Sequence, residues 1–247
     1  YSIAAWTVGK FSIPEAQGGA GMDCTALALA CEEIAAGDGA TCTIIMVTNL
    51  VANILQGYGN EAQKKEFLAP LAQGKLLGAF CLTEPHAGSD AAAITTRAER
   101  SGGHYVLNGV KQFITSGKNA DIAVVFAVTD KKQGKRGVSA FVVPTSTPGY
   151  KVARVEDKTG QRASDTAQIL LEDCKLPAAS LPGQMGSPGG DASPFVFSGS
   201  LVVQGKGTQE FIEFTLEPEI LKQARLGYEA VLNPDLLLPR LGVDESG

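Results

Sequence analysis

The hydrophobic pattern of this 247-residue chain changes its period once, close to Leu76. Before this point apolar residues recur every three to four positions, as on amphipathic helices, and after it they alternate, as in half-buried strands. Helices that precede a block of strands, rather than alternating with them, are typical of α+β folds. The pattern therefore predicts an α+β fold, in which an N-terminal helical bundle is followed by an antiparallel, barrel-like β-domain.

Local signals predict three helices in the first 75 residues, which we assign to an N-terminal helical domain at 1–75. Asp23 is suited to cap the first helix, and the Gly-Asp-Gly sequence at 37–39 ends it. Thr41 or Thr43 is expected to begin the second helix. Residues 60–63, Asn-Glu-Ala-Gln, resemble the capping box of a third.

The second block predicts a middle β-domain at residues 76–181. Asn108-Gly109 is a strong signal for a two-residue hairpin turn, so the strands on either side of it should pair. The expected strands are 76–82, 95–99, 104–107, 110–115, 122–129, 138–143, 152–155 and 168–171. Residues 181–194 are rich in Pro, Gly and Ser and indicate a linker, so 182–247 are expected to be a linker and a C-terminal tail.

Composition argues against several classes of protein. A hydrophobic fraction of 44% excludes disorder of the whole chain, and a net charge of −5 argues against a nucleic-acid-binding surface. No apolar run reaches the roughly 18–20 residues of a membrane span. Five cysteines without a C-x-x-C motif, together with only His86 and His104, predict no metal site. Buried, reduced thiols in a reducing compartment are the expected alternative.

The segment 80–90, Phe-Cys-Leu-Thr-Glu-Pro-His-Ala-Gly-Ser-Asp, carries the first candidate site. A strand is expected to lead into a loop in which Gly88 allows a ligand to approach the backbone. Thr83 and Ser89 offer hydroxyl groups, and the loop amides could bind an anion. Taken alone, the same segment is better explained as a polar turn capped by its Thr and Ser residues.

The segment 108–117, Asn-Gly-Val-Lys-Gln-Phe-Ile-Thr-Ser-Gly, carries the second candidate site. An aromatic residue at Phe113 could cover a flat ring, and the hydroxyl of Thr115 could bond to a ring nitrogen. The alternative is a core phenylalanine on a half-buried strand.

Together the two segments resemble the acyl-CoA dehydrogenase family. Residues 82–90 fit its signature L-T-E-P-x-A-G-S-D, and residues 108–115 fit N-G-x-K-x-[WF]-I-[ST]. Residues 13–21 resemble the I-P-E-x-x-G-G-x-G loop of the family, and residues 59–64 resemble its G-T/N-E-x-Q-K segment. The resemblance extends over roughly residues 9–183, with several motifs in order at family spacing.

The resemblance implies an FAD-dependent oxidoreductase of fatty acid or amino acid catabolism. In the family an acyl-CoA thioester loses its α-proton to a base and a hydride from its β-carbon to the flavin, which gives a trans-2-enoyl-CoA. Electrons then pass to electron-transfer flavoprotein. The implied FAD-binding residues are Phe80, Cys81, Leu82, Thr83, Gly88, Ser89, Phe113, Ile114 and Thr115. Ser89 is also implied to contact the acyl-CoA.

The resemblance stops near residue 183, and this leaves several expectations open. The family's catalytic glutamate lies on a C-terminal helical domain that is not recognisable here, so no catalytic base is assigned. The chain is expected to be an incomplete, truncated form, and the family's homo-oligomer is in doubt for it. A non-catalytic binding or interaction fragment and an acyl-CoA oxidase-like member remain alternatives. The expected location is the bacterial cytoplasm or the mitochondrial matrix.

Overall fold

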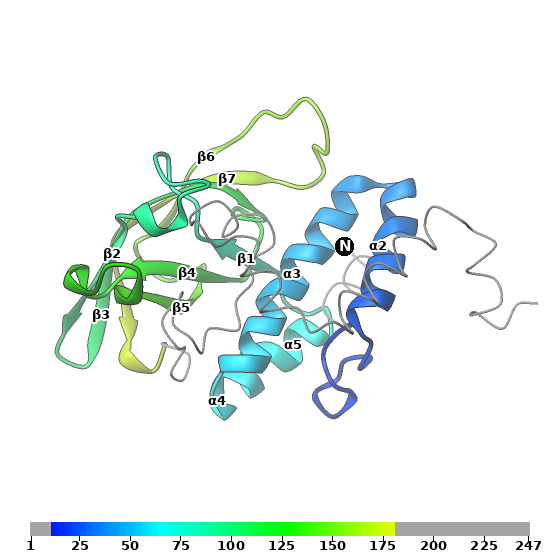
Figure 1. Ribbon diagram of the computed structural model, residues 1–247, viewed down its shortest axis with the longest axis horizontal. Coiled ribbons are helices and arrows are strands. Elements are labelled where there is room, and N and C mark those ends of the chain that lie inside the picture. The colour runs from blue at the N-terminus through cyan, green and yellow to red at the C-terminus, as the bar shows by residue number, and fades with distance from the viewer. Residues whose placement is uncertain (1–10, 181–247) are drawn as a thin grey trace, which may run out of the picture. The chain divides into compact units, whose positions relative to one another are not determined.

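Helices occupy the N-terminal part of the computed structural model, which describes residues 11–180 (Figure 1). The two long helices, α2 (Cys24–Gly37) and α3 (Gly39–Tyr58), meet at Asp38. The Asp23 carboxylate accepts a hydrogen bond of 2.8 Å from the Ala26 amide, which confirms Asp23 as the cap of the first helix. Such a cap provides a hydrogen-bond acceptor for an amide group that has no partner within its own helix.

Asp38, rather than Thr41 or Thr43, begins α3. Its amide donates to the last turn of α2, while its carboxylate accepts hydrogen bonds from the amides of Ala40 and Thr41. The Thr41 hydroxyl itself donates to Asp38, and the Thr43 hydroxyl donates to the Gly39 carbonyl. The expectation of a threonine cap was therefore wrong, because one aspartate both ends α2 and starts α3.

The third helical segment consists of α4 (Glu61–Gln63), a π-helical stretch (Lys64–Leu68) and α5 (Ala69–Ala72), which follow one another without a break. Asn60 and Gln63 form the predicted capping box, in which each side chain bonds to the other residue's backbone amide. Short 3₁₀ helices lie elsewhere in the described chain, at Glu15–Gln17, Ala91–Ala93, Lys131–Gly137 and Ala178–Ser180.

Seven strands form one curled sheet after the helices (Figure 1). They are β1 (Gly78–Cys81), β2 (Arg97–Ser101), β3 (His104–Thr115), β4 (Ile122–Val128), β5 (Val138–Pro144), β6 (Tyr150–Val155) and β7 (Thr166–Pro177). The fold class is confirmed, but the sheet is mixed rather than wholly antiparallel. β1 pairs in parallel with β4 over four residues, and β2 meets β4 in parallel at Arg97 and Val128.

The Asn108-Gly109 pair does not form a turn. It lies inside the continuous twelve-residue strand β3, at an irregularity in its pairing with β7. Gly109 is needed there because Thr96, the residue before β2, passes so closely that a Cβ would lie 2.3 Å from its hydroxyl oxygen. The hairpin was predicted wrongly because a glycine that admits a close backbone neighbour gives the same sequence signal as a turn.

Two hydrophobic cores lie on the two faces of the sheet. The outer core joins α3, including Val51 and Leu55, to the sheet residues Val124 and Phe126. The inner core fills the curl of the sheet and includes Phe141. Helices and sheet therefore share the outer core, although they are separate blocks in the sequence.

Helix α3 is long and apolar enough to cross a membrane, with a mean hydropathy of 1.4, and no other described helix meets this criterion. Half of the residues in the apolar window are buried inside the structure, as they are in a core helix. Length and composition alone do not distinguish the two cases, so the absence of a membrane span stays a prediction.

Candidate functional site

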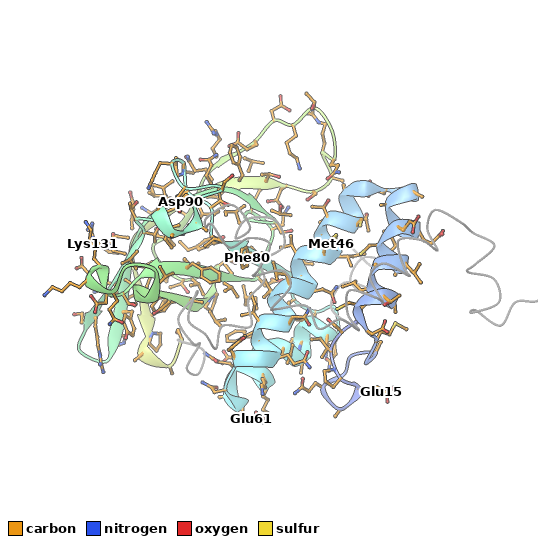
Figure 2. All side chains as sticks on the ribbon, viewed as in Figure 1. Glu15, Met46, Glu61, Phe80, Asp90 and Lys131 are labelled. Atoms are coloured by element: carbon orange, nitrogen blue, oxygen red, sulfur yellow. The ribbon has the colours of Figure 1, made fainter. Side chains whose placement is uncertain are left out.

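The alternation of β1 separates the side chains of the first motif into two groups. Ala79 and Cys81 point into the inner core, whereas Phe80 and Leu82 pack on the outer core that contains α3. The Phe80 ring lies 5.1 Å from that of Phe126, and Figure 2 shows Phe80 beside α3. Because the Cys81 side chain faces away from those of Phe80 and Leu82, only its backbone can contribute to a site shared with them.

The loop after β1 turns sharply and exposes its small residues. Glu84 and Ala87 exchange two backbone hydrogen bonds of 3.0 Å, while Gly88 and Ser89 lie at the surface. Asp90, labelled in Figure 2, caps the 3₁₀ helix that follows by accepting from the Ala92 amide. No Cβ on Gly88 would meet a neighbouring atom within 4 Å, so its backbone is open to a ligand.

The second motif lies on β3, where the strand bulges between Lys111 and Ile114. The Gln112 amide donates to the Thr83 carbonyl at 2.8 Å, so the two motifs are in direct contact. Phe113 has a backbone φ of +57°, which residues other than glycine rarely adopt, and its side chain is 62% exposed. Ile114 returns to the inner core. The alternative interpretation, that Phe113 is a core residue of a half-buried strand, is therefore excluded.

A fully buried ion pair joins the two motifs from inside. Lys111 Nζ lies 2.8 Å from Glu84 Oε1, and their side chains are 0% and 1% exposed. Lys111 also donates to the Leu82 carbonyl at 3.0 Å. The Glu84 carboxylate accepts further hydrogen bonds from the Thr95 amide, the Thr95 hydroxyl and the Thr96 amide. Both ends of the loop 84–96 are thus fixed to one carboxylate.

The environment of Glu84 favours its charged form. Burial by itself would raise the pKa of this carboxyl, but the Lys111 charge and the hydrogen bonds that Glu84 accepts lower it to about 2. Burial also lowers the pKa of Lys111, and the charge of Glu84 opposes this effect.

A chain of polar side chains runs outward from Gln112 across β7 and β6. Gln112 accepts a hydrogen bond of 2.6 Å from Gln168 and donates one of 2.8 Å to Glu156. Arg154 completes the chain with an ion pair of 2.7 Å to Glu156. These contacts hold the residue that immediately precedes Phe113.

The structure thus brings Thr83, just after β1, against the bulge that carries Phe113, with Thr115 two residues further along β3. Within residues 11–180 the hydroxyls of Thr83, Ser89 and Thr115 make no hydrogen bond. An exposed aromatic ring, next in sequence to a residue that bonds to Thr83 with its free hydroxyl, fits a flat, heteroatom-rich ligand. The side chains of Leu82 and Ile114 are buried in the two cores, so they can only support such a ligand from behind.

Glu84 and Lys111 occur in the two motifs, but the sequence alone assigned them no role. The sequence does contain a hint of their role. Lys111 lies within an expected strand and Glu84 lies just after one, and charged residues are rarely buried unless they are paired. Among residues 11–180 no group of three His, Cys, Asp or Glu residues could hold a metal ion. Cys31, Cys42, Cys81 and Cys174 are free and buried, whereas Cys24 is free and exposed.

Two family models match this chain. The N-terminal domain of acyl-CoA dehydrogenases matches residues 7–75, and the middle domain of acyl-CoA dehydrogenases matches residues 79–174. Both segments that form the candidate site fall within the second match.

Individual relatives agree with these matches. Human mitochondrial short-chain specific acyl-CoA dehydrogenase is 43% identical over 175 residues, which are 70% of this chain and 42% of the human protein. The structure of butyryl-CoA dehydrogenase from Megasphaera elsdenii is 40% identical, with a TM-score of 0.70, over 74% of this chain and 49% of that one. A glutaryl-CoA dehydrogenase from Mycobacterium smegmatis in complex with FADH2 is 36% identical, with a TM-score of 0.67, over 73% and 47%. The chain therefore spans less than half the length of these relatives.

Proposed function

The chain belongs to the acyl-CoA dehydrogenase family, and from this membership we propose that it binds FAD between the end of β1 and the bulge of β3. In this proposal it acts in the α,β-dehydrogenation of an acyl-CoA thioester to a trans-2-enoyl-CoA. The observation that carries the proposal is Phe113, an exposed aromatic residue held at a positive φ beside Thr83. The relative described with FADH2 supports the choice of flavin.

The residues of the site have distinct parts in this proposal. Phe113 covers one face of the ring system, and the hydroxyls of Thr83 and Thr115 bond to its polar edge. The open backbone at Gly88 and the hydroxyl of Ser89 receive a phosphate of the cofactor or the acyl-CoA. FAD, when bound, supplies the acceptor for the substrate hydride. No residue is assigned as the base.

The relatives also suggest substrate, partner and location. The names of two of them specify short-chain and butyryl-CoA substrates, so we propose a short acyl-CoA here. Electron-transfer flavoprotein is the proposed electron acceptor, as the family resemblance implies. Relatives from a bacterium and from mitochondria, together with four buried free thiols, support a reducing compartment such as the bacterial cytoplasm or the mitochondrial matrix.

A flavin-loading experiment tests the proposal. The purified full chain is incubated with excess FAD and desalted, its visible spectrum is recorded, and butyryl-CoA is then added anaerobically. We expect flavin bands that survive desalting in the wild type and in Ser101→Ala, whose exposed side chain lies at the end of β2, but are weaker in Phe113→Ala.

The outcomes separate the alternatives. Bleaching by butyryl-CoA supports dehydrogenation by this chain. Flavin bands that do not bleach support a binding protein without chemistry. A colourless wild-type protein contradicts the proposal.

A further inference from the structure

The two segments proposed to face the flavin are joined by side chains that do not face it themselves. Lys111 and Glu84 are buried, yet each is close in sequence to an exposed residue of the site: Glu84 follows Thr83 directly, and Lys111 precedes Phe113 by two residues. Their link complements the backbone hydrogen bond between Gln112 and Thr83. Together these contacts fix the end of β1 against the bulge of β3.

The bulge needs such a support because Phe113 supplies none. Its ring is mostly exposed, and a positive φ is unfavourable for a residue with a Cβ, so the conformation persists only where neighbours impose it. On one side Ile114 is anchored in the inner core. On the other side one anchor is Gln112, whose amide donates to the Thr83 carbonyl. The second anchor on that side is Lys111, through its bonds to Glu84 and to the Leu82 carbonyl.

Packing alone does not explain a charged pair at this position. Replacing a buried ion pair by apolar residues of similar volume is often neutral or stabilising. An apolar pair, however, could not bond to the Leu82 carbonyl or to the Thr95 and Thr96 amides, all of which are bound here. The pair therefore supplies directional bonds that hold the two motifs and the loop 84–96, which contains Gly88 and Ser89, in one arrangement.

We propose that Lys111 and Glu84 are positioning residues for the flavin, which hold Phe113 and the Thr83 strand end in the arrangement that receives the ring. This inference rests on the proposed binding of FAD. It concerns residues that do not touch the cofactor. The effect of replacing them should therefore depend on Phe113, whereas the effect of replacing a residue in direct contact with FAD need not. Removing the pair should weaken FAD binding more when Phe113 is present than when it is absent.

A double-mutant cycle on the full chain tests this inference. The dissociation constant for FAD is measured by fluorescence titration for the wild type, Phe113→Ala, the pair variant Lys111→Met/Glu84→Gln and the triple variant. We expect the pair variant to bind FAD about tenfold more weakly, and the triple variant to bind it more tightly than the product of the two separate effects predicts. The visible circular dichroism of bound flavin should change alike in the pair variant and in Phe113→Ala.

Lys151→Met is the matched control, because it makes the same replacement in the exposed ion pair between Lys151 and Glu172. It should bind FAD as the wild type does. If the pair variant does not unfold cooperatively, Glu84→Gln alone is measured, and its affinity should fall between those of the wild type and Phe113→Ala.

Three results would overturn the inference. They are unchanged affinity in a folded pair variant or in Glu84→Gln, effects of the pair variant and Phe113→Ala that simply multiply in the triple variant, and equal weakening by Lys151→Met. A wild-type chain that binds no FAD is a different result. It would remove the proposed function itself, and the inference with it.

Discussion

Gly78 in β1 lies directly against Val51 in α3, so closely that a Cβ on Gly78 would come within 2.8 Å of the Val51 Cβ. The Gly78 amide also faces the Thr48 hydroxyl of the same helix, at 3.4 Å. This contact sets the distance between the helices and the strand that leads into the candidate site.

We expect Gly78→Ala to lower the free energy of unfolding by about 1–3 kcal/mol, because the added methyl group must push the helix away from the strand. Gly57→Ala is the matched control. Gly57 lies near the end of α3 with no atom within 4 Å of the added Cβ, and its replacement should stabilise by roughly 0.5–1 kcal/mol. Urea unfolding measures both, and equal effects of the two substitutions would contradict this account.

The joint between α2 and α3 should depend on Asp38 more than on a common helix cap. Its carboxylate accepts from two amides and from the Thr41 hydroxyl, whereas Asp23 accepts from one amide. We expect Asp38→Ala to lower the Tm more than Asp23→Ala does, and Asp38→Asn to retain most of the stability. Thermal unfolding followed by circular dichroism checks the order, and a larger loss for Asp23→Ala would refute it.

Stability should fall in acid through Glu84. The pKa of this carboxyl is about 2 in the folded chain, below its ordinary value of 4.5. Its contribution is therefore complete above pH 4.5 and is lost as the pH falls from 4.5 to 2, a loss on the order of 3 kcal/mol. Urea unfolding across this pH range should show a flatter curve for Lys111→Met/Glu84→Gln than for the wild type.

Glu172→Gln is the control for this pH dependence, because Glu172 is the exposed partner of Lys151. Exposed pairs contribute little to stability, so the acid dependence of Glu172→Gln should match that of the wild type. A pair variant as acid-sensitive as the wild type would show that another group governs the transition.

Replacing Phe113 by glycine should relieve backbone strain and at the same time weaken flavin binding. Phe113→Gly accepts a φ of +57° without strain, so it should be about 1 kcal/mol more stable than Phe113→Ala, which keeps the conformation and its cost. Both variants lose the ring and should bind FAD more weakly than the wild type. Chemical unfolding of the flavin-free chain and FAD titration measure the two quantities separately, and a glycine variant less stable than the alanine variant would argue against strain.

The sequence was sufficient to predict what local chemistry decides. The Asp23 cap and the Asn60–Gln63 capping box are confirmed because each depends on residues within three positions of one another. The parallel pairing of β1 with β4 was not predicted, since its partners are more than forty residues apart. Gly109 was misread for the same reason, because its requirement comes from Thr96, which precedes a different strand.

The same distinction applies to the candidate site. The motif residues Thr83 and Phe113 were found from sequence, but their contact through Gln112 and the ion pair behind them depend on the register of β3 against the end of β1. That register is a tertiary property. Which motif side chains face a ligand and which face a core also became clear only from the alternation of β1 and the bulge of β3.

The outer core, in which α3 residues pack with those of β4, has a consequence for how the chain unfolds. Neither the helices nor the sheet can unfold without exposing the core residues of the other. The period change at Leu76 is therefore not a boundary between two independently folding units. We expect a single cooperative transition for residues 11–180, with coincident curves from far-ultraviolet and tyrosine signals. For the same reason, a protease cut in the connection between α5 and β1 should leave two pieces that stay together.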